Sequence, residues 1–337
     1  MKALIYTAKN KVEVGQIEEP QVRAKTVKIK VDYCALCATD VHIVTQGLYG
    51  LPTPVPLGHE SCGTIIELGE GAAEQGWKIG DRVSVASCSP CGVCDECKRG
   101  NDIFCDAMPV PYYAPMMAEY AVVDINMIFR IPAYETDVRK YCLAEPCAAA
   151  MRGIDLADIR IGDTVAISGV GGIGSILLNM ILLAGGARVT AIEPVESKRK
   201  LALEMGAQYT IDPSRENLME RVMEITDGRG FDRVFEVSGV PAAAPPVMEM
   251  LAHKGKAIYF AVYPMDYELP VNLYQMFAKE TSIQGVFTTI YNYPRVMDII
   301  PRLQIDKIIG IELPLDRAAE AFDLFLESKY PKIVVKC

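Results

Sequence analysis

The sequence predicts an α/β protein that combines a β-rich part with a doubly wound parallel sheet. From about residue 154 onward, short apolar strands alternate with helical stretches, a spacing typical of βαβ units and parallel sheets. Residues 1 to about 145 instead carry short β patterns bounded by glycine and proline. At 337 residues the chain exceeds the usual length of one domain, which favours two domains.

The strands expected in the β-rich part are short segments with apolar and polar residues in alternation or between glycines. After residue 287 the alternation of strands and helices ends, and the remaining residues are expected to belong to the β-rich part. The strands are expected at 27–34, 61–69, 81–87 and 332–336, and a helix at 318–328.

The alternating part begins with an uncharged stretch at 164–187, which is long enough to span a membrane. Its six glycines and scattered polar residues instead favour a strand, a glycine turn and a buried helix. No membrane partner is therefore expected. The strands are expected at 164–168, 188–193, 208–212, 232–238 and 256–262, with a helix at 195–206.

Composition and charge limit the possible partners and the compartment. Half of the residues are apolar and the net charge is −9, so nucleic acid is not expected, because phosphate binding needs a basic face. The eleven cysteines are odd in number and no export signal is recognisable at the first residues. We therefore expect a cytoplasmic protein in which clustered cysteines bind metal and do not form disulfides.

A glycine-rich turn follows the first strand of the alternating part. GVGGIG at 169–174 fits G-x-G-x-x-G through Gly169, Gly171 and Gly174, and an apolar helix follows. Such glycines allow a tight turn and let the backbone approach a pyrophosphate at the helix N-terminus. Glu193, nineteen residues after Gly174, can bind both ribose hydroxyls and repel a 2′-phosphate. The motif therefore predicts a dinucleotide site that prefers NAD to NADP.

Three basic residues after the second strand leave that preference open. Lys198, Arg199 and Lys200 can hold a 2′-phosphate or form a solvated helix face. The other expected contacts to the cofactor are Gly172, Ile173, Lys198, Val262 and Phe287.

Four cysteines lie within fifteen residues, in CGVCDECKRGNDIFC at 91–105. In a bacterial [4Fe–4S] run the fourth cysteine follows three residues after the third and precedes proline. Here Cys105 comes after a gap of seven residues and precedes Asp106. Four thiolates on one loop suit a closed, structural zinc site. The expected ligands are Cys91, Cys94, Cys97 and Cys105, with Cys88 as a spare thiol.

Two of the three histidines lie in motifs that hold other metal-binding residue types. CATDVH at 37–42 contains Cys37, Thr39 and His42, and GHE at 58–60 contains His59 and Glu60. A thiolate, an imidazole and a carboxylate can form an open zinc site that leaves a position for substrate. These motifs therefore predict a second, catalytic metal site.

In this order and at these separations, CATDVH, GHE, the four-cysteine loop and GVGGIG resemble the zinc-dependent medium-chain dehydrogenases over essentially the whole chain. The resemblance implies a GroES-like catalytic domain and a Rossmann NAD-binding domain. The catalytic domain would comprise residues 1–147, including the zinc loop at 88–105, and 285–337, and the Rossmann domain residues 148–284. The nearest branch is that of the sorbitol dehydrogenase type.

The same resemblance implies the ligands of a catalytic zinc ion. Cys37 and His59 are ligands in the family pattern, and Glu60 lies near the metal and can enter its shell. Glu145, in LAEPCAAAMRG at 143–153, matches the remaining ligand position, while its rival Cys147 is two residues away. Whether Glu60 or Glu145 binds the resting zinc stays open from the sequence.

The reaction implied is hydride transfer between an alcohol and the nicotinamide. Bound zinc lowers the pKa of the alcohol hydroxyl, and the dinucleotide domain holds the hydride acceptor. The proton would leave by the Thr39 hydroxyl, the cofactor ribose and His42. Thr39 could also be a helix N-cap. The cofactors expected are one catalytic zinc, one structural zinc and NAD.

The substrate is expected to be a secondary alcohol or polyol, with some features that point to a less polar molecule. GVFTTIYNYP at 285–294 resembles the polyol-binding segment G-V-F-R-Y-x-N-x-x-P, but its Arg-Tyr pair is Thr288-Thr289 here. Apolar residues replace the expected tyrosine at Ile43 and the expected glycines at Met116-Met117. These changes suggest adaptable apolar surface and a bulkier cyclic alcohol such as a hydroxysteroid. Hydroxyl groups could instead be bound by Tyr112, Tyr113, Tyr291 and Asn292.

The sequence thus predicts a cytoplasmic, zinc-dependent, NAD-linked oxidoreductase that forms a homo-oligomer, either a dimer or a tetramer. Its partner is a small-molecule alcohol or ketone. The rival from another class is a metal- and nucleotide-binding scaffold without catalytic turnover.

Overall fold

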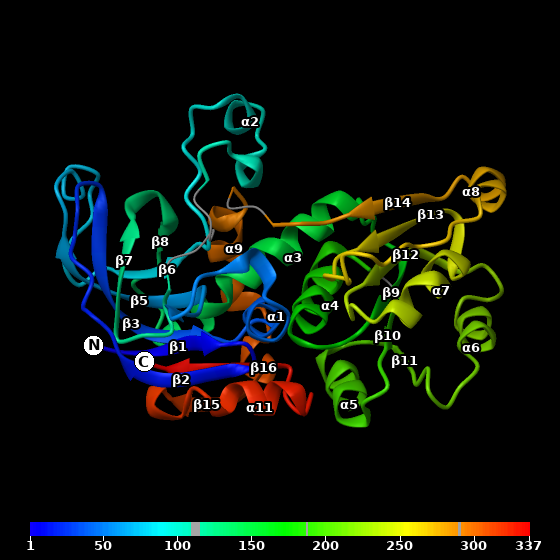
Figure 1. The fold of residues 1–337 in the computed structure, drawn as a ribbon. Coiled ribbons are helices and arrows are strands. Elements are labelled where there is room, and N and C mark those ends of the chain that lie inside the picture. The colour runs from blue at the N-terminus through cyan, green and yellow to red at the C-terminus, as the bar shows by residue number, and fades with distance from the viewer. Residues whose placement is uncertain (109–114, 187, 289–290) are drawn as a thin grey trace. The chain divides into compact units, whose positions relative to one another are not determined.

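The computed structural model describes residues 1–108, 115–186, 188–288 and 291–337, and the chain forms two compact units (Figure 1). Unit 1 comprises Met1–Ala148 and Thr289–Cys337, and unit 2 comprises Ala149–Thr288. Unit 1 is rich in antiparallel strands and unit 2 alternates strands with helices. The predicted α/β fold class is confirmed.

Unit 2 contains a six-stranded sheet in the order β11-β10-β9-β12-β13-β14, and every neighbouring pair is parallel. The chain starts in the centre at β9, builds one side through β10 and β11, and then crosses to β12 on the other side. The strand order therefore reverses between β9 and β12, where sheets of this type bind ligands at the carboxyl ends of the strands. The strands are β9 (Thr164–Ser168), β10 (Arg188–Ile192), β11 (Tyr209–Ile211), β12 (Phe231–Glu236), β13 (Leu251–Tyr259) and β14 (Ser282–Gly285).

Helices connect the strands of unit 2, as the spacing predicts (Figure 1). All five residues of β9 are buried, as expected for a central strand covered on both faces. The helices are α4 (Gly172–Ala184), α5 (Glu196–Met205), α6 (Leu218–Ile225), α7 (Ala244–Glu249) and α8 (Leu273–Lys279). A core cluster under the sheet contains Ala166, Ile192, Ile211, Val222, Ile225, Phe231, Val234, Val247, Met250, Leu251 and Ala257.

Unit 1 contains a small sheet, β2-β1-β4, and a larger sheet in the order β15-β16-β3-β5-β6-β8, with β7 also pairing with β3. The strands are β1 (Lys2–Ala8), β2 (Lys11–Gln16), β3 (Thr26–Ala35), β4 (Val55–Pro56), β5 (Glu60–Leu68), β6 (Arg82–Val85), β7 (Tyr120–Asp124), β8 (Ile128–Arg130), β15 (Ile309–Pro314) and β16 (Lys332–Lys336).

Strand β3 joins parts of the chain that are far apart in the sequence. Its residues Val27, Ile29 and Val31 are completely buried, because alternate side chains point to the same face. At its carboxyl end, Ala35 pairs with Glu60 of β5 on one side and with Val334 of β16 on the other. The sheet therefore brings residue 37, residues 59–60 and residue 332 into one neighbourhood.

The helices of unit 1 are short, and the four-cysteine segment around α2 projects from the rest of the unit (Figure 1). The helices are α1 (Ala38–Gln46), α2 (Asp95–Lys98), α3 (Ala144–Ala157, which continues into unit 2), α9 (Tyr293–Ile299), α10 (Ile305–Ile308) and α11 (Glu320–Leu326). Short 3-10 helices cover Leu48–Gly50, Asp102–Phe104, Ile125–Met127, Val138–Leu143, Pro241–Ala243, Ile300–Arg302 and Leu315–Arg317.

The uncharged stretch at 164–187 folds as β9, the glycine turn and α4 as far as residue 186, and residue 187 lies outside the described residues. Within the described ranges, the helices are too short or too polar for a membrane crossing.

Candidate functional site

Cys37 lies at the start of α1, where it caps the helix. Its sulfur accepts a hydrogen bond from the backbone N–H of Thr39 at 3.4 Å, and its own N–H donates to the carboxylate of Asp40 at 3.0 Å. This reciprocal pair is a capping box. The N-cap residue is therefore Cys37, and the suggestion that Thr39 is the N-cap is wrong. The cap fixes the thiol on the backbone and leaves the side chain half-buried.

His59 and Glu60 follow a glycine that the local packing requires. Gly58 has a φ of +98°, and a Cβ atom there would lie 2.6 Å from the backbone nitrogen of Met117. Only glycine fits such a position without strain. The tight approach places the next two side chains at the start of β5, where His59 and Glu60 are both buried.

The structure brings three of the four predicted ligands together. The ligand atoms of Cys37, His59 and Glu60 all lie within 4.8 Å of one another. One sulfur, one nitrogen and one oxygen at this spacing match the donor set of an open zinc site. The residues present therefore fit a metal ion.

The position of Asp40 beside His59 also fits a metal site. Its carboxylate lies 3.3 Å from Nδ1 of His59, the arrangement that commonly orients a metal-binding imidazole. Burial alone would lower the pKa of His59, but Asp40 and Cys37 together raise this pKa well above its ordinary value. Asp40 and Cys37 thus surround the His59 imidazole with acidic groups, whose negative charge a bound cation would balance.

Lys332 of β16 lies at the same cluster and was not among the candidates that the sequence provided. Its ammonium donates hydrogen bonds to both carboxylate oxygens of Glu60 and to the carbonyl of Leu36 at 3.2 Å. Burial alone would lower the pKa of Lys332, but Glu60 and Cys37 raise it above its ordinary value. The available signal was a lysine inside KIVVK, since a buried strand rarely holds a charge without a partner.

Glu145 lies in the first turn of α3 and is not part of the 4.8 Å group formed by the other three residues. It accepts a hydrogen bond from the hydroxyl of Ser87 at 3.1 Å. Its rival Cys147 is completely buried, and burial, reinforced by Glu60, raises the pKa of this thiol well above its ordinary value. Cys147, like Glu145, is not part of the 4.8 Å group.

Thr39 and His42 lie one turn apart on α1, and both side chains are half-buried. Side chains three residues apart share one face of a helix. Burial lowers the pKa of His42 below its ordinary value, so its imidazole is neutral near pH 7. A neutral imidazole beside a hydroxyl is a suitable proton acceptor.

The four loop cysteines form a second cluster in unit 1. The sulfur atoms of Cys91, Cys94, Cys97 and Cys105 lie within 4.8 Å of one another, and those of Cys94 and Cys105 are 3.9 Å apart. A tetrahedral zinc ion with bonds of about 2.3 Å separates its sulfur ligands by roughly 3.8 Å. The cluster therefore has the size of a closed zinc site.

Backbone N–H groups stabilise thiolates in this loop. The sulfur of Cys91 accepts from Val93 at 3.4 Å and from Cys94 at 3.3 Å, and these bonds lower the pKa of Cys91 to about 6. Cys88 lies outside the cluster, and burial raises its pKa to about 12. None of the eleven cysteines, all of which lie among the described residues, forms a disulfide.

In unit 2 the glycine turn joins β9 to α4 as the motif predicts. Gly169 has a φ of +94°, and a Cβ atom at Gly174 would lie 2.1 Å from the carbonyl oxygen of Gly169. Gly171 caps α4 without a side-chain hydrogen bond, and Gly172 and Ile173 form its first turn. The first N–H groups of this helix therefore remain available for a pyrophosphate.

Glu193 directly follows β10 and is tied to the same turn. One carboxylate oxygen accepts from the backbone N–H of Val170 at 2.9 Å and the other from that of Val195 at 3.0 Å. Arg199 does not face outward as a phosphate-binding residue, because it donates to the carbonyl of Glu193 at 2.6 Å and pairs with Asp212 at 3.0 Å. The acid is thus fixed beside the glycine turn.

The remaining candidate cofactor residues keep accessible surface. Lys198 is half-buried at the start of α5, Lys200 pairs with Glu196 at 2.6 Å, and the side chains of Val262 and Phe287 are about half exposed.

Several residues considered for substrate binding have other positions than expected. Met116 and Met117 are completely buried, and the sulfur of Met116 lies 2.8 Å from the Ser61 hydroxyl. Ile43 is completely buried as well. The expectation that these residues add adaptable substrate-facing surface is therefore wrong, because they fill the core of unit 1.

The segment before α9 retains polar groups. The backbone N–H of Tyr291 donates to the carboxylate of Asp102 at 3.1 Å. Asn292 is 9% exposed, and its amide nitrogen has no hydrogen-bond partner among the described residues. Tyr112, Tyr113 and Thr289 lie outside the described residues.

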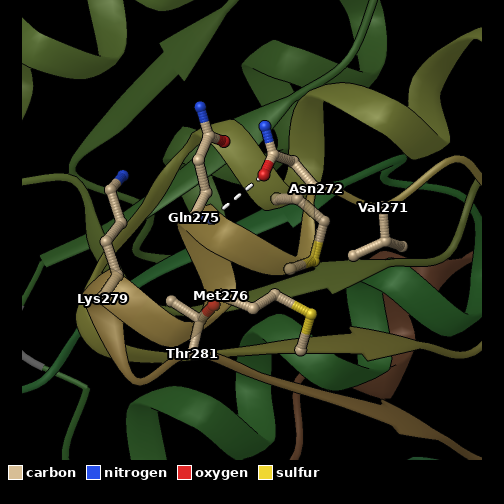
Figure 2. A pocket seen from close by; sticks show the side chains of 7 residues that line it. Val271, Asn272, Gln275, Met276, Lys279 and Thr281 are labelled. Carbon is tan, nitrogen blue, oxygen red and sulfur yellow. Dashed lines mark hydrogen bonds between the residues drawn. The ribbon is translucent and has the colours of Figure 1, made fainter.

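A pocket in unit 2 is lined by none of the candidate residues (Figure 2). Its charged lining residue, Lys279, donates to the carbonyl of Leu251 at 3.1 Å, and Asn272 accepts from the backbone N–H of Gln275, capping α8. These interactions hold the helix in place and suggest no chemistry.

A thiolate–imidazole–carboxylate cluster, a closed four-cysteine site and a glycine turn on a doubly wound sheet define a zinc- and dinucleotide-dependent oxidoreductase. Residues 23–133 match the alcohol dehydrogenase GroES-like domain, and residues 172–302 match the zinc-binding dehydrogenase domain. The chain belongs to the zinc-dependent medium-chain dehydrogenase family. The predicted family, enzyme class and cofactors, zinc and a nicotinamide dinucleotide, are confirmed.

Individual relatives cover nearly the whole chain. Sorbitol dehydrogenase of Halalkalibacterium halodurans is 33% identical over 85% of this chain and 83% of its own length. The crystal structure of a putative zinc-binding dehydrogenase from Clostridium scindens is 34% identical, covers 100% of this chain and 99% of its own, and has a TM-score of 0.95. A putative zinc-binding dehydrogenase from Sinorhizobium meliloti, bound to NADP, is 27% identical over 100% of this chain and 99% of its own, with a TM-score of 0.91.

Proposed function

We propose that this chain oxidises a secondary alcohol or polyol to the ketone with NAD, at a catalytic zinc held by Cys37, His59 and Glu60. The observation that carries the proposal is the approach of their three ligand atoms to within 4.8 Å. Glu145 is a further carboxylate that can replace Glu60 in the metal shell. Residues 1–147 and 285–337 supply this chemistry, and residues 148–284 bind the cofactor.

When bound, zinc acts as a Lewis acid that makes an alcohol hydroxyl easier to deprotonate. The surrounding residues set the charge and geometry for this role. Asp40 orients His59, and Lys332 holds the Glu60 carboxylate. The half-buried side chain of Cys37 supports an opening through which substrate reaches the site.

Thr39 and His42 remove the proton. The Thr39 hydroxyl would accept the proton of the substrate hydroxyl while it releases its own proton toward His42, and the ribose hydroxyls of a bound cofactor would supply the link between the two residues. Support comes from their shared face on α1 and from the lowered pKa of His42, which keeps the imidazole ready to accept a proton near neutral pH.

NAD is the proposed cofactor, with NADP less favoured. The pyrophosphate would bind at the N-terminus of α4, and Glu193 would accept hydrogen bonds from the adenosine ribose. The fixed position of Glu193 and the internal contacts of Arg199 support NAD. Lys198, Val262 and Phe287 would complete the cofactor contacts.

A polyol or other secondary alcohol is favoured over a bulkier, less polar cyclic alcohol. The relative from Halalkalibacterium halodurans is a sorbitol dehydrogenase. The apolar alternative depended in part on Met116 and Met117, which are buried in the core. The amide nitrogen of Asn292, which has no hydrogen-bond partner in the part of the chain that the structure describes, is a donor that suits a substrate hydroxyl. Thr288 in place of arginine remains the feature in favour of a substrate with fewer hydroxyl groups.

The four-cysteine loop is proposed to hold a structural zinc, which gives two zinc ions per chain. All four positions of a tetrahedral ion would be filled by Cys91, Cys94, Cys97 and Cys105, so this site has no place for substrate. The lack of disulfides among the described cysteines supports a cytoplasmic location.

The edge of the parallel sheet has the features of a subunit interface, which supports a homo-oligomer, either a dimer or a tetramer. Strand β14 ends the sheet, and Ile283 on it is 38% exposed. Beside it, α8 leaves Leu273, Tyr274 and Phe277 at least 75% exposed. An open strand edge with exposed large apolar side chains is typical of a subunit interface. Light scattering of the native chain and of Phe277→Asp tests this surface.

The function is tested by assaying polyols, simple secondary alcohols and hydroxysteroids with NAD and with NADP, together with zinc analysis. We expect about two zinc ions per chain and the highest kcat/KM with NAD and a secondary alcohol or polyol. Absence of turnover throughout the panel, with two zinc ions bound, would favour the scaffold alternative.

A further inference from the structure

Glu236 is a buried acid on the cofactor side of unit 2 that the sequence analysis did not single out. It ends β12 and is completely buried. Its carboxylate accepts hydrogen bonds from the backbone N–H and the hydroxyl of Ser238 and from the hydroxyl of Tyr263. Within the described part of the chain it has no lysine or arginine partner. These neutral donors therefore satisfy the carboxylate.

Tyr263, just beyond β13, belongs to a row of tyrosines that hold the same region. Its ring stacks on that of Tyr267, with centroids 5.4 Å apart, and lies at 6.5 Å from that of Tyr259. The hydroxyl of Tyr267 donates to the carbonyl of Pro241 at 2.9 Å, and that of Tyr259 donates to the carbonyl of Ala244 at 2.8 Å. The three tyrosines thus connect the end of β13 and the segment after it to the end of β12 and the segment after that strand.

The hydrogen-bonded group formed by Glu236, Ser238 and Tyr263 lies against the glycine turn. A Cβ atom at Gly169 would lie 2.9 Å from Cα of Ser238, so the turn after β12 packs directly on the first glycine of the motif. A Cβ atom at Gly239 would lie 3.1 Å from the carbonyl oxygen of Val262. Glu236 and Tyr263 therefore join the turns after β12 and β13 beside the point where the strand order reverses.

We propose that Glu236 and Tyr263 are positioning residues that fix these two turns as the platform for the nicotinamide half of the cofactor. The glycine turn and Glu193 lie on the β9–β10 side of the place where the strand order reverses, and they would bind the pyrophosphate and the adenosine. The β12–β13 side is therefore left for the nicotinamide half of the dinucleotide. The exposed side chains of Val240 and Val262, 52% and 54% exposed, stand on the two joined turns. The inference rests on the dinucleotide site of the proposed function.

A tyrosine hydroxyl bonded to a buried carboxylate is suited to this role. Hydrogen bonds to a charged acceptor are short and strong, and the stacked rings restrict the tyrosine's movement. Loss of the hydroxyl would leave the ring in place but release the tie between the two turns. The adenosine side, held by separate bonds from Glu193 to Val170 and Val195, would keep its geometry.

The experiment compares two ligands in calorimetric titrations of the zinc-loaded protein: NADH, and ADP-ribose, which lacks the nicotinamide. The variants are Tyr263→Phe, Glu236→Gln and their double variant, with Tyr134→Phe, at a tyrosine of unit 1 that is 75% exposed, as the control. We expect each single variant to weaken NADH binding about tenfold and to leave the Kd of ADP-ribose within about twofold. The double variant should bind NADH no more than about twofold weaker than Glu236→Gln, because both changes break one interaction.

Equal weakening of both ligands would assign the pair a general role in folding and overturn the proposal, as would unchanged binding of NADH. Wild-type protein that binds neither ligand would instead remove the dinucleotide site on which the proposal rests. Circular dichroism melting of each variant shows whether it is folded. If Glu236→Gln does not fold, Tyr263→Phe alone decides, since it removes a single oxygen atom.

Discussion

The two metal-binding clusters of unit 1 are built in opposite ways. The four-cysteine cluster lies within fifteen consecutive residues, and neighbouring backbone N–H groups of the same loop support its thiolates. The other cluster joins residue 37 to residues 59 and 60, and its ion-pair partner, Lys332, comes from the end of the chain. A local cluster can thus be specified by spacing alone, whereas a distributed one depends on the sheet that assembles it.

The difference extends to how charge is balanced. In the loop, hydrogen bonds from the backbone lower the pKa of exposed Cys91. In the distributed site His59 and Glu60 are buried, and buried Asp40 and Lys332 place charges beside them. A metal ion in the four-cysteine loop would hold the projecting segment around α2 together. The charged groups around the buried site would instead tune the reactivity of a bound ion.

The largest expected effect is on activity, from Cys37→Ser. Loss of this ligand should lower kcat/KM by at least about 10³-fold, which corresponds to about 4 kcal/mol. Zinc content should fall from about two to about one per chain, while the melting temperature stays within a few degrees. Activity within tenfold of the wild type would show that the catalytic ion is not held here.

Cys97→Ser tests the other cluster by stability. Loss of a structural metal site should destabilise the protein by on the order of 3–5 kcal/mol, because the projecting loop has little core of its own. Denaturant unfolding with zinc analysis measures both changes, and Val93→Ala in the same loop is the matched control. If stability is unchanged although one zinc ion is lost, the loop needs no metal to fold.

Lys332→Met removes the buried positive charge that pairs with Glu60 and so tests whether Glu60 also contacts a bound metal ion. Without the lysine, Glu60 would remain buried as an unpaired carboxylate, which costs on the order of 3 kcal/mol. The loss should be smaller in the zinc-loaded protein, because the cation compensates the same carboxylate. Unfolding free energies of the variant before and after mild chelation test this, with exposed Lys329→Met as control. An equal loss in both states would rule out contact between Glu60 and the ion.

His42→Ala should have the smallest effect, a decrease in alcohol oxidation of about tenfold near pH 7, at the low end for general acid–base catalysis. Because burial lowers the pKa of His42, the wild-type rate should fall only as pH drops below about 6.5, when the imidazole becomes protonated. The variant should lose this acidic limb. A pH profile that keeps the limb in His42→Ala would assign it to another group.

How far the sequence predicts each site depends on the distance between its residues. The glycine turn could be predicted because Gly169, Gly171 and Gly174 meet local steric limits. Asp40 gave no readable local signal, since its role arises from contact with His59. The lysine in KIVVK indicated a buried partner for Lys332 but did not identify it as Glu60, which lies 272 positions away. Met116 and Met117 stand where the family pattern has glycines and were expected to form apolar surface near the substrate. Both are buried in the structure, and Met117 packs against Gly58.

The sequence by itself determined the α/β class, the four-cysteine spacing and the glycine turn, because their constraints act between residues that are close along the chain. Only the tertiary structure decided that Glu60 meets Lys332 and that Tyr263 meets Glu236. Those contacts depend on strand order and register, which bring residues tens to hundreds of positions apart into contact through pairings that no short segment encodes.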